Sequence, residues 1–155
     1  KTYFILNYGC QMNESDAEHY AGQLEEMGYA KADDFHNADI IVVNTCCVRE
    51  SAEKRILGKI GELKRVKENH PGQVICVAGC MAQKDGEKLI KKHPQIDLLI
   101  GTAHVNSFKE ILTDFLADKG GRIFIMAGNA HAAAVILVIG FRTVSFRIKH
   151  TARRF

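Results

Sequence analysis

The sequence lacks any long hydrophobic run and any recognisable export signal. Its longest apolar stretch, Ala132 to Gly140, falls well short of the roughly 18 residues that a membrane-crossing helix needs. The first residues do not follow the basic, apolar, small-residue order of a signal peptide. A hydrophobic fraction of 46% beside 25% charged residues is typical of a soluble globular protein. From the 155 residues we expect one core and no membrane partner.

Cysteine is scarce, and its spacing argues against two common uses. Five cysteines are too few for a disulfide scaffold of this length, and an odd number leaves one unpaired. No C-x2-C pair occurs, so the chain lacks both the thioredoxin-like redox motif and the close pairs of structural zinc sites. A redox disulfide between distant cysteines stays open as an alternative. We expect a protein of the reducing cytoplasm, with thiols free to bind metal.

Acidic residues are absent from the end of the chain. Residues 1–121 contain 15 lysines and arginines and all 18 acidic residues, whereas residues 122–155 contain six basic residues and no acid. A change of this kind often marks a boundary. The sequence therefore predicts a domain over residues 1–121 and a basic tail over residues 122–155. Residues 134–139 and 144–148 of this tail alternate as strands do, and its positive charge suits either solvated strand edges or contact with nucleic acid.

Strand and helix patterns alternate along residues 1–121. Strands are predicted at residues 2–8, 38–44, 73–78 and 96–101, with a weaker one at 29–31. Amphipathic helices are predicted from Asn13 or Ser15 to about Met27 and over residues 50–69, 85–92 and 105–118. This alternation is typical of right-handed βαβ crossovers. The fold class is therefore α/β, an open parallel sheet of about five strands flanked by helices, with the flavodoxin-like strand order 2-1-3-4-5.

Three cysteines follow three different predicted strands. Cys10, Cys46 and Cys80 each come just after an apolar strand, two of them behind a glycine that lets the backbone turn sharply. In the predicted order these strands are neighbours, about 4.8 Å apart. Ligands of open α/β sheets bind at the carboxyl ends of the strands. We therefore expect the three thiols to meet at that edge and form a metal centre.

The other two cysteines are expected to play different parts. Cys76 lies in the middle of a predicted strand, where cysteine behaves as a small buried hydrophobe. Its spacing to Cys80 begins the radical S-adenosylmethionine signature C-x3-C-x2-C, but Gln83 stands at the third position. Cys47 is expected to be a bystander, because adjacent side chains point apart.

Thiolate ligation favours either zinc or an iron–sulfur cluster. Structural zinc sites use four ligands, commonly in close pairs. A 4Fe–4S cluster held by three cysteines leaves one iron open, and three separate loops suit a wide cluster better than a compact ion.

The motifs around these cysteines resemble the N-terminal domain of the radical S-adenosylmethionine tRNA methylthiotransferases, in particular the bacterial enzymes that modify isopentenyladenosine. The matching segments are GCQMNESD at residues 9–16, NTCCVRE at 44–50, VAGCMA at 77–82 and IGT at 100–102. The resemblance covers about residues 1–121. It implies that Cys10, Cys46 and Cys80 bind an auxiliary 4Fe–4S cluster whose open iron holds the sulfur to be donated.

The resemblance also implies partners. In the full enzyme, a second domain carries another 4Fe–4S cluster and S-adenosylmethionine, a further domain binds RNA, and the substrate is a tRNA with isopentenyladenosine next to the anticodon. Neither those domains nor the C-x3-C-x2-C motif is found in this sequence, so we expect the chain alone to be inactive as a transferase. The tail, residues 122–155, matches nothing in the family.

Two other functions stay open. A flavodoxin-like binding or electron-transfer module without a cluster would share the topology, since fold does not fix function. An RNA or protein interaction domain with incidental cysteines would account for the basic tail.

Overall fold

The computed structural model describes residues 1–9, 11–46, 50–117, 122–125, 134–139 and 142–147. The described strands are β1 (Thr2–Tyr8), β2 (Ala30–Lys31), β3 (Ile40–Thr45), β4 (Val74–Gly79), β5 (Leu98–Ile100), β6 (Arg122–Ile125), β7 (Ala134–Ile139) and β8 (Arg142–Arg147). The helices are α1 (Gln11–Glu26), α2 (Glu50–Asn69), α3 (Cys80–Lys92) and α4 (Phe108–Ala117), with short 3-10 turns η1 (Phe35–Asn37) and η2 (Thr102–Ser107).

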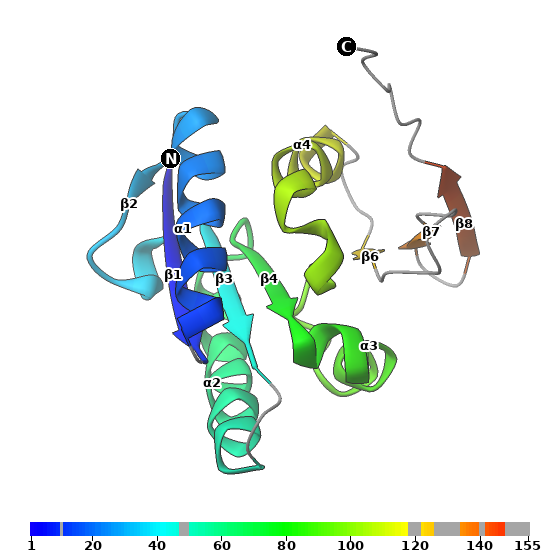
Figure 1. Ribbon diagram of the computed structural model, residues 1–155, viewed down its shortest axis with the longest axis horizontal. Coiled ribbons are helices and arrows are strands. Elements are labelled where there is room, and N and C mark those ends of the chain that lie inside the picture. Colours follow the sequence, from blue (N-terminus) through cyan, green and yellow to red (C-terminus); the bar gives the residue numbers. More distant parts are fainter. Residues whose placement is uncertain (10, 47–49, 118–121, 126–133, 140–141, 148–155) are drawn as a thin grey trace.

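The strands form one sheet in the order β2-β1-β3-β4-β5-β6-β7-β8. Pairing is parallel from β2 through β6 and antiparallel between β6, β7 and β8. Figure 1 shows β1, β3 and β4 as neighbouring arrows that point the same way. The predicted α/β class and the flavodoxin-like order 2-1-3-4-5 are therefore confirmed. The predicted strand at residues 134–139 is β7, while Ile148 lies outside the described residues.

Helices cover both faces of the sheet. On one face, Tyr20 and Leu24 of α1 and Phe108 of α4 pack against alternate residues of the central strands. On the other face, α2 and α3 pack their apolar sides against the intervening residues. All six residues of β3 and all six of β4 are buried. This accounts for their nearly continuous apolar sequences, because strands buried on both faces do not alternate with polar residues.

Two helices begin earlier than the sequence pattern predicted. Asn13 and Ser15 were the predicted N-caps of the first helix, but α1 begins at Gln11 and Asn13 is buried inside its first turn. The third helix begins at Cys80 rather than Asp85, and Asp85 (φ −119°, ψ 18°) is instead a break within it. In both cases, groups on β3 hold the first turn, as described below. Among the described residues, no helix is long and apolar enough to cross a membrane.

Candidate metal centre

The central strands end at the same level of the sheet. Tyr8 of β1 is paired in register with Thr45 of β3, and Thr45 with Gly79 of β4. Cys46 and Cys80 are the residues that directly follow two of these three positions. Both cysteines thus come directly after the carboxyl ends of neighbouring strands.

Cys10 lies outside the described residues, and so does Cys47. The residues on either side of Cys10 are described: Gly9 follows the last residue of β1, and Gln11 is the first residue of α1. The convergence of all three sulfurs stays a prediction. Over the described part of the chain, no group of three His, Cys, Asp or Glu side chains is arranged to hold a metal.

The described cysteines differ in burial. Cys46 is 5% exposed, and Cys80 is half-buried at the first residue of α3. Cys76 is fully buried in the middle of β4, as predicted, and burial raises the pKa of its thiol. At about 3.3 Å per residue along a strand, Cys76 is set back from Cys80 by on the order of 13 Å. Cys76 therefore belongs to the hydrophobic core and not to the sheet edge.

Asn44, near the end of β3, forms hydrogen bonds with Asn7 and Asn13, on either side of residue 10 in the sequence. Its Nδ2 donates to Oδ1 of Asn7 at 3.1 Å and to the backbone oxygen of Asn13 at 2.7 Å, while its Oδ1 accepts from Asn13 Nδ2 at 3.4 Å. Asn13 Nδ2 also donates to the backbone oxygen of Thr45 at 3.1 Å. Because Asn44 is fully buried, these bonds satisfy an amide that would be costly to leave unpaired. They join the end of β1 and the first turn of α1 to β3.

Thr45 forms hydrogen bonds with Ala78 and Met81, on either side of Cys80 in the sequence. Its hydroxyl donates to the backbone oxygen of Ala78 at 2.6 Å and accepts from the backbone N–H of Met81 at 3.3 Å. Gly79, the N-cap residue of α3, has no side chain with which to cap the helix. The Thr45 hydroxyl therefore satisfies one of the free N–H groups in the first turn of α3.

Both glycines at this edge make room for these contacts. Gly79 has φ 98°, and a Cβ built there would lie 2.3 Å from the backbone oxygen of Thr45. A Cβ at Gly9 would lie 2.2 Å from Oδ1 of Asn13. At Gly79 the nearest atom belongs to the backbone of Thr45, whereas at Gly9 it belongs to the side chain of Asn13. The positive φ of Gly79 agrees with the sharp turn predicted before Cys80.

The helix N-termini at this edge of the sheet favour the thiolate form of nearby cysteines. Helices α1 and α3 both start at the carboxyl ends of strands, with Cys80 itself as the first residue of α3. A helix N-terminus carries a partial positive charge, which stabilises thiolate sulfur. At the outer side of the same helix, Lys84 pairs with Glu53 of α2 at 3.3 Å.

The described donors fit a thiolate-bound group. Cys46 and Cys80 supply two sulfurs from the ends of adjacent strands, and Gly79, which has no Cβ, lets the end of β4 approach the backbone of Thr45 closely. Sequence reasoning missed the supporting residues Asn44 and Thr45. The signal that could have revealed them is a polar pair, directly before Cys46, at the end of an otherwise apolar strand.

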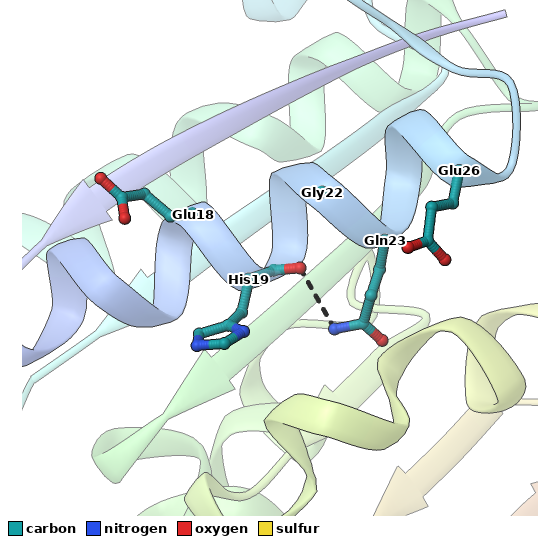
Figure 2. A pocket seen from close by; sticks show the side chains of 5 residues that line it. All are labelled: Glu18, His19, Gly22, Gln23 and Glu26. Carbon is teal, nitrogen blue, oxygen red and sulfur yellow. Dashed lines mark hydrogen bonds between the residues drawn. The ribbon is translucent and has the colours of Figure 1, made fainter.

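A polar hollow lies elsewhere, along the side of α1 that faces η2 and α4 (Figure 2). It is lined by Glu18, His19, Gly22, Gln23 and Glu26. Its Gln23 donates to the backbone oxygen of Val105 at 2.8 Å and to that of His19 at 3.2 Å. No cysteine of the described chain lines this hollow, and its Gln23 connects α1 to η2, so we assign it a structural part and not a metal site.

The fold and the site together define a class: an open-sheet α/β domain with cysteines at the ends of neighbouring parallel strands. The chain belongs to the family described as uncharacterized protein family UPF0004, whose sequence profile matches residues 2–101.

Curated relatives share the name tRNA-2-methylthio-N(6)-dimethylallyladenosine synthase. The protein of Clostridium tetani is 48% identical over 113 residues, which are 72% of this chain and 25% of the relative. That of Corynebacterium efficiens is 47% identical over 112 residues, 72% of this chain and 21% of the relative. That of Natranaerobius thermophilus is 42% identical over 125 residues, 79% of this chain and 28% of the relative. The resemblance predicted from the cysteine motifs is confirmed, and the chain spans about a quarter of the length of these relatives.

Proposed function

We propose that this chain is the cluster-binding part of a tRNA methylthiotransferase that adds a methylthio group to isopentenyladenosine next to the anticodon. In this proposal Cys10, Cys46 and Cys80 bind an auxiliary 4Fe–4S cluster. The observation that carries it is the pairing of Tyr8, Thr45 and Gly79 at one level of the sheet. The names of the relatives support the choice of reaction and of tRNA as substrate.

The residues of this chain hold and orient the group. When bound, the cluster would supply the sulfur to be donated, at the iron that three cysteines leave open. Cys46 and Cys80 directly follow two adjacent strands, and Cys80 is the first residue of α3, whose N-terminus would offset negative charge on its sulfur. Cys46 is 5% exposed, so a group bound at its sulfur would be partly shielded from water.

The remaining chemistry is proposed to lie in other parts of the enzyme. These parts would carry the second 4Fe–4S cluster, S-adenosylmethionine and the RNA-binding domain. That division agrees with a chain that spans about a quarter of its relatives' length. We propose that residues 1–121 form the cluster domain, that the enzyme acts in the cytoplasm, and that this chain alone does not methylthiolate tRNA.

Iron and acid-labile sulfide, measured after oxygen-free reconstitution of the chain, test the proposal. We expect about four irons per chain, as in a 4Fe–4S cluster, and a broad visible absorbance. Cys10→Ala, Cys46→Ala and Cys80→Ala should each remove most of the iron. Cys76→Ala is the matched control, because Cys76 is buried in the core, and it should retain the iron.

Two results would count against this function. Full iron binding by Cys10→Ala would remove the third ligand from the proposal. A yellow, iron-free protein would favour the flavodoxin-like alternative.

A further inference from the structure

The two residues directly before Cys46 contact the segments that contain the other two cysteines. We propose that Asn44 and Thr45 are positioning residues that fix the segments of Cys10 and Cys80 on either side of Cys46. This inference rests on the proposed function, because it concerns how the ligands of that cluster are held.

Asn44 contacts both ends of the seven-residue segment centred on Cys10. Asn7 lies three residues before Cys10 and Asn13 three residues after it. Asn44 Nδ2 donates to both, to the side-chain oxygen of Asn7 at 3.1 Å and to the backbone oxygen of Asn13 at 2.7 Å. One amide thus uses both of its hydrogens to hold the two ends of this segment. Their distance from Cys46 is thereby fixed.

Thr45 does the same for the segment of Cys80. Its hydroxyl donates to the backbone oxygen of Ala78, two residues before Cys80, and accepts from the N–H of Met81, one residue after it. Thr45 is fully buried. A buried hydroxyl with both a donor and an acceptor partner has one preferred orientation. The turn that presents the Cys80 sulfur is therefore attached to β3 on both sides.

The chemistry of the two side chains suits support and not ligation. Neither the amide nor the hydroxyl carries a charge, so they do not compete with thiolates for iron. Groups that orient metal ligands typically change metal affinity by about 10–100-fold when they are removed. Asn44 and Thr45 should therefore affect how long a cluster is held without serving as its ligands.

The test compares the rate at which the reconstituted 155-residue chain loses iron to a chelator. We expect Asn44→Ala and Thr45→Val to lose iron at least about 10-fold faster than the wild-type chain. Thr45→Ser, which keeps the hydroxyl, should restore the slow rate. Thr113→Val is the matched control, because the Thr113 hydroxyl also donates to a backbone oxygen, that of Lys109 at 2.7 Å, but in α4. It should leave the rate unchanged.

A spectroscopic measurement separates positioning from loss of folding. Circular dichroism and the urea midpoint of the cluster-free variants report whether each one folds. The electron paramagnetic resonance spectrum of the reduced cluster should change in Thr45→Val and return in Thr45→Ser. If Asn44→Ala does not fold, the Thr45 series decides.

Wild-type loading with unchanged rates and spectra in the variants would overturn the inference and leave the proposed function intact. Equal acceleration by Thr113→Val would overturn it too, since general destabilisation would then explain the effect. A wild-type chain that binds no iron would reject the proposed function and this inference together.

Discussion

Only glycine fits position 79 without strain, for two reasons. Its φ of 98° lies in a region that side chains rarely adopt, and a Cβ there would lie 2.3 Å from the backbone oxygen of Thr45. Gly58, in the middle of α2, has open space around it, because a Cβ there would meet no neighbouring atom within 4 Å. The backbone geometry therefore requires glycine at position 79, whereas Gly58 only lowers the stability of α2.

Alanine substitution should separate the two glycines. Gly79→Ala should lower the free energy of unfolding by about 2 kcal/mol or more, because backbone strain of about 1–3 kcal/mol adds to a steric clash. Gly58→Ala should raise it by about 0.5–1 kcal/mol, the usual gain from replacing a helical glycine. Urea unfolding of the chain measures both, and equal effects at the two sites would contradict this account of Gly79.

Two buried tyrosines differ in whether the hydroxyl has a partner. Tyr3 donates to Oε1 of Glu25 at 2.8 Å, and burial together with Glu25 raises the pKa of Tyr3 to about 12. Tyr20 is fully buried against Phe108, its hydroxyl has no partner among the described residues, and burial raises its pKa as well. Both phenols therefore stay protonated in the folded chain well above neutral pH.

Phenylalanine substitution should have opposite signs at the two tyrosines. Tyr20→Phe should raise the free energy of unfolding by about 1 kcal/mol, whereas Tyr3→Phe should lower it by a similar amount. The stability that comes from the raised pKa of Tyr3 is fully present below about pH 10, where unfolded tyrosine is protonated, and is lost as pH rises through about 12. Urea unfolding at about pH 7 and about pH 11, on either side of the ordinary tyrosine pKa, measures both effects. Destabilisation by Tyr20→Phe at neutral pH would reveal a partner for its hydroxyl.

At the scale of elements, Gln23 joins two helices that cover one face of the sheet (Figure 2). Its Nε2 donates to the backbone oxygen of Val105, and its Oε1 accepts from the backbone N–H of Lys109 at 2.9 Å. The second bond satisfies a free N–H in the first turn of α4. Glu26, one turn further along α1, pairs with the Lys109 side chain at 3.0 Å but is exposed.

Gln23→Ala should therefore destabilise the chain more than Glu26→Ala. Loss of two partly buried hydrogen bonds is expected to cost about 1–3 kcal/mol, whereas an exposed ion pair contributes at most about 1 kcal/mol. Urea unfolding of the two variants checks the order. A Glu26→Ala effect as large as that of Gln23→Ala would show that charge and not helix capping connects α1 to α4.

The start of a helix is where sequence reasoning fell short in this chain. The apolar runs of β3 and β4 and the amphipathic pattern of α2 predicted those elements nearly to the residue, because burial on a regular lattice leaves a periodic signal. The first turns of α1 and α3 are instead held by Asn44 and Thr45, which are more than 30 residues away along the chain. Such tertiary contacts leave no periodic signal in the sequences of the helices themselves. The positions of Cys46 and Cys80 after their strands follow from the apolar runs, whereas the partners of Asn44 and Thr45 follow only from the folded chain.

At the scale of the whole molecule, charge is divided along the chain. The basic segment of residues 122–155 contributes β6, β7 and β8, which continue the sheet beyond β5. Its six basic residues are Arg122, Arg142, Arg147, Lys149, Arg153 and Arg154. Under the proposed function, this basic segment is the part of the chain expected to attract the phosphates of RNA.

Replacing these six residues by glutamine should weaken binding of the chain to RNA and reduce its salt dependence. The slope of the logarithm of the binding constant against the logarithm of salt concentration should become shallower. The change is about 0.7–0.9 for each phosphate that the variant no longer neutralises. Fluorescence anisotropy with a labelled RNA at several salt concentrations measures the slope. A slope identical to that of the wild-type chain would assign no RNA contact to this segment.

The convergence of three sulfurs across three strands is tested most directly by a crystal structure of the reconstituted chain, solved without oxygen, with anomalous scattering recorded at the iron edge. We expect iron density at the carboxyl edge of the sheet, within bonding distance of the sulfurs of Cys10, Cys46 and Cys80. Iron bound by other side chains, or a Cys10 sulfur directed away from Cys46 and Cys80 in a chain that holds its full iron content, would contradict the account.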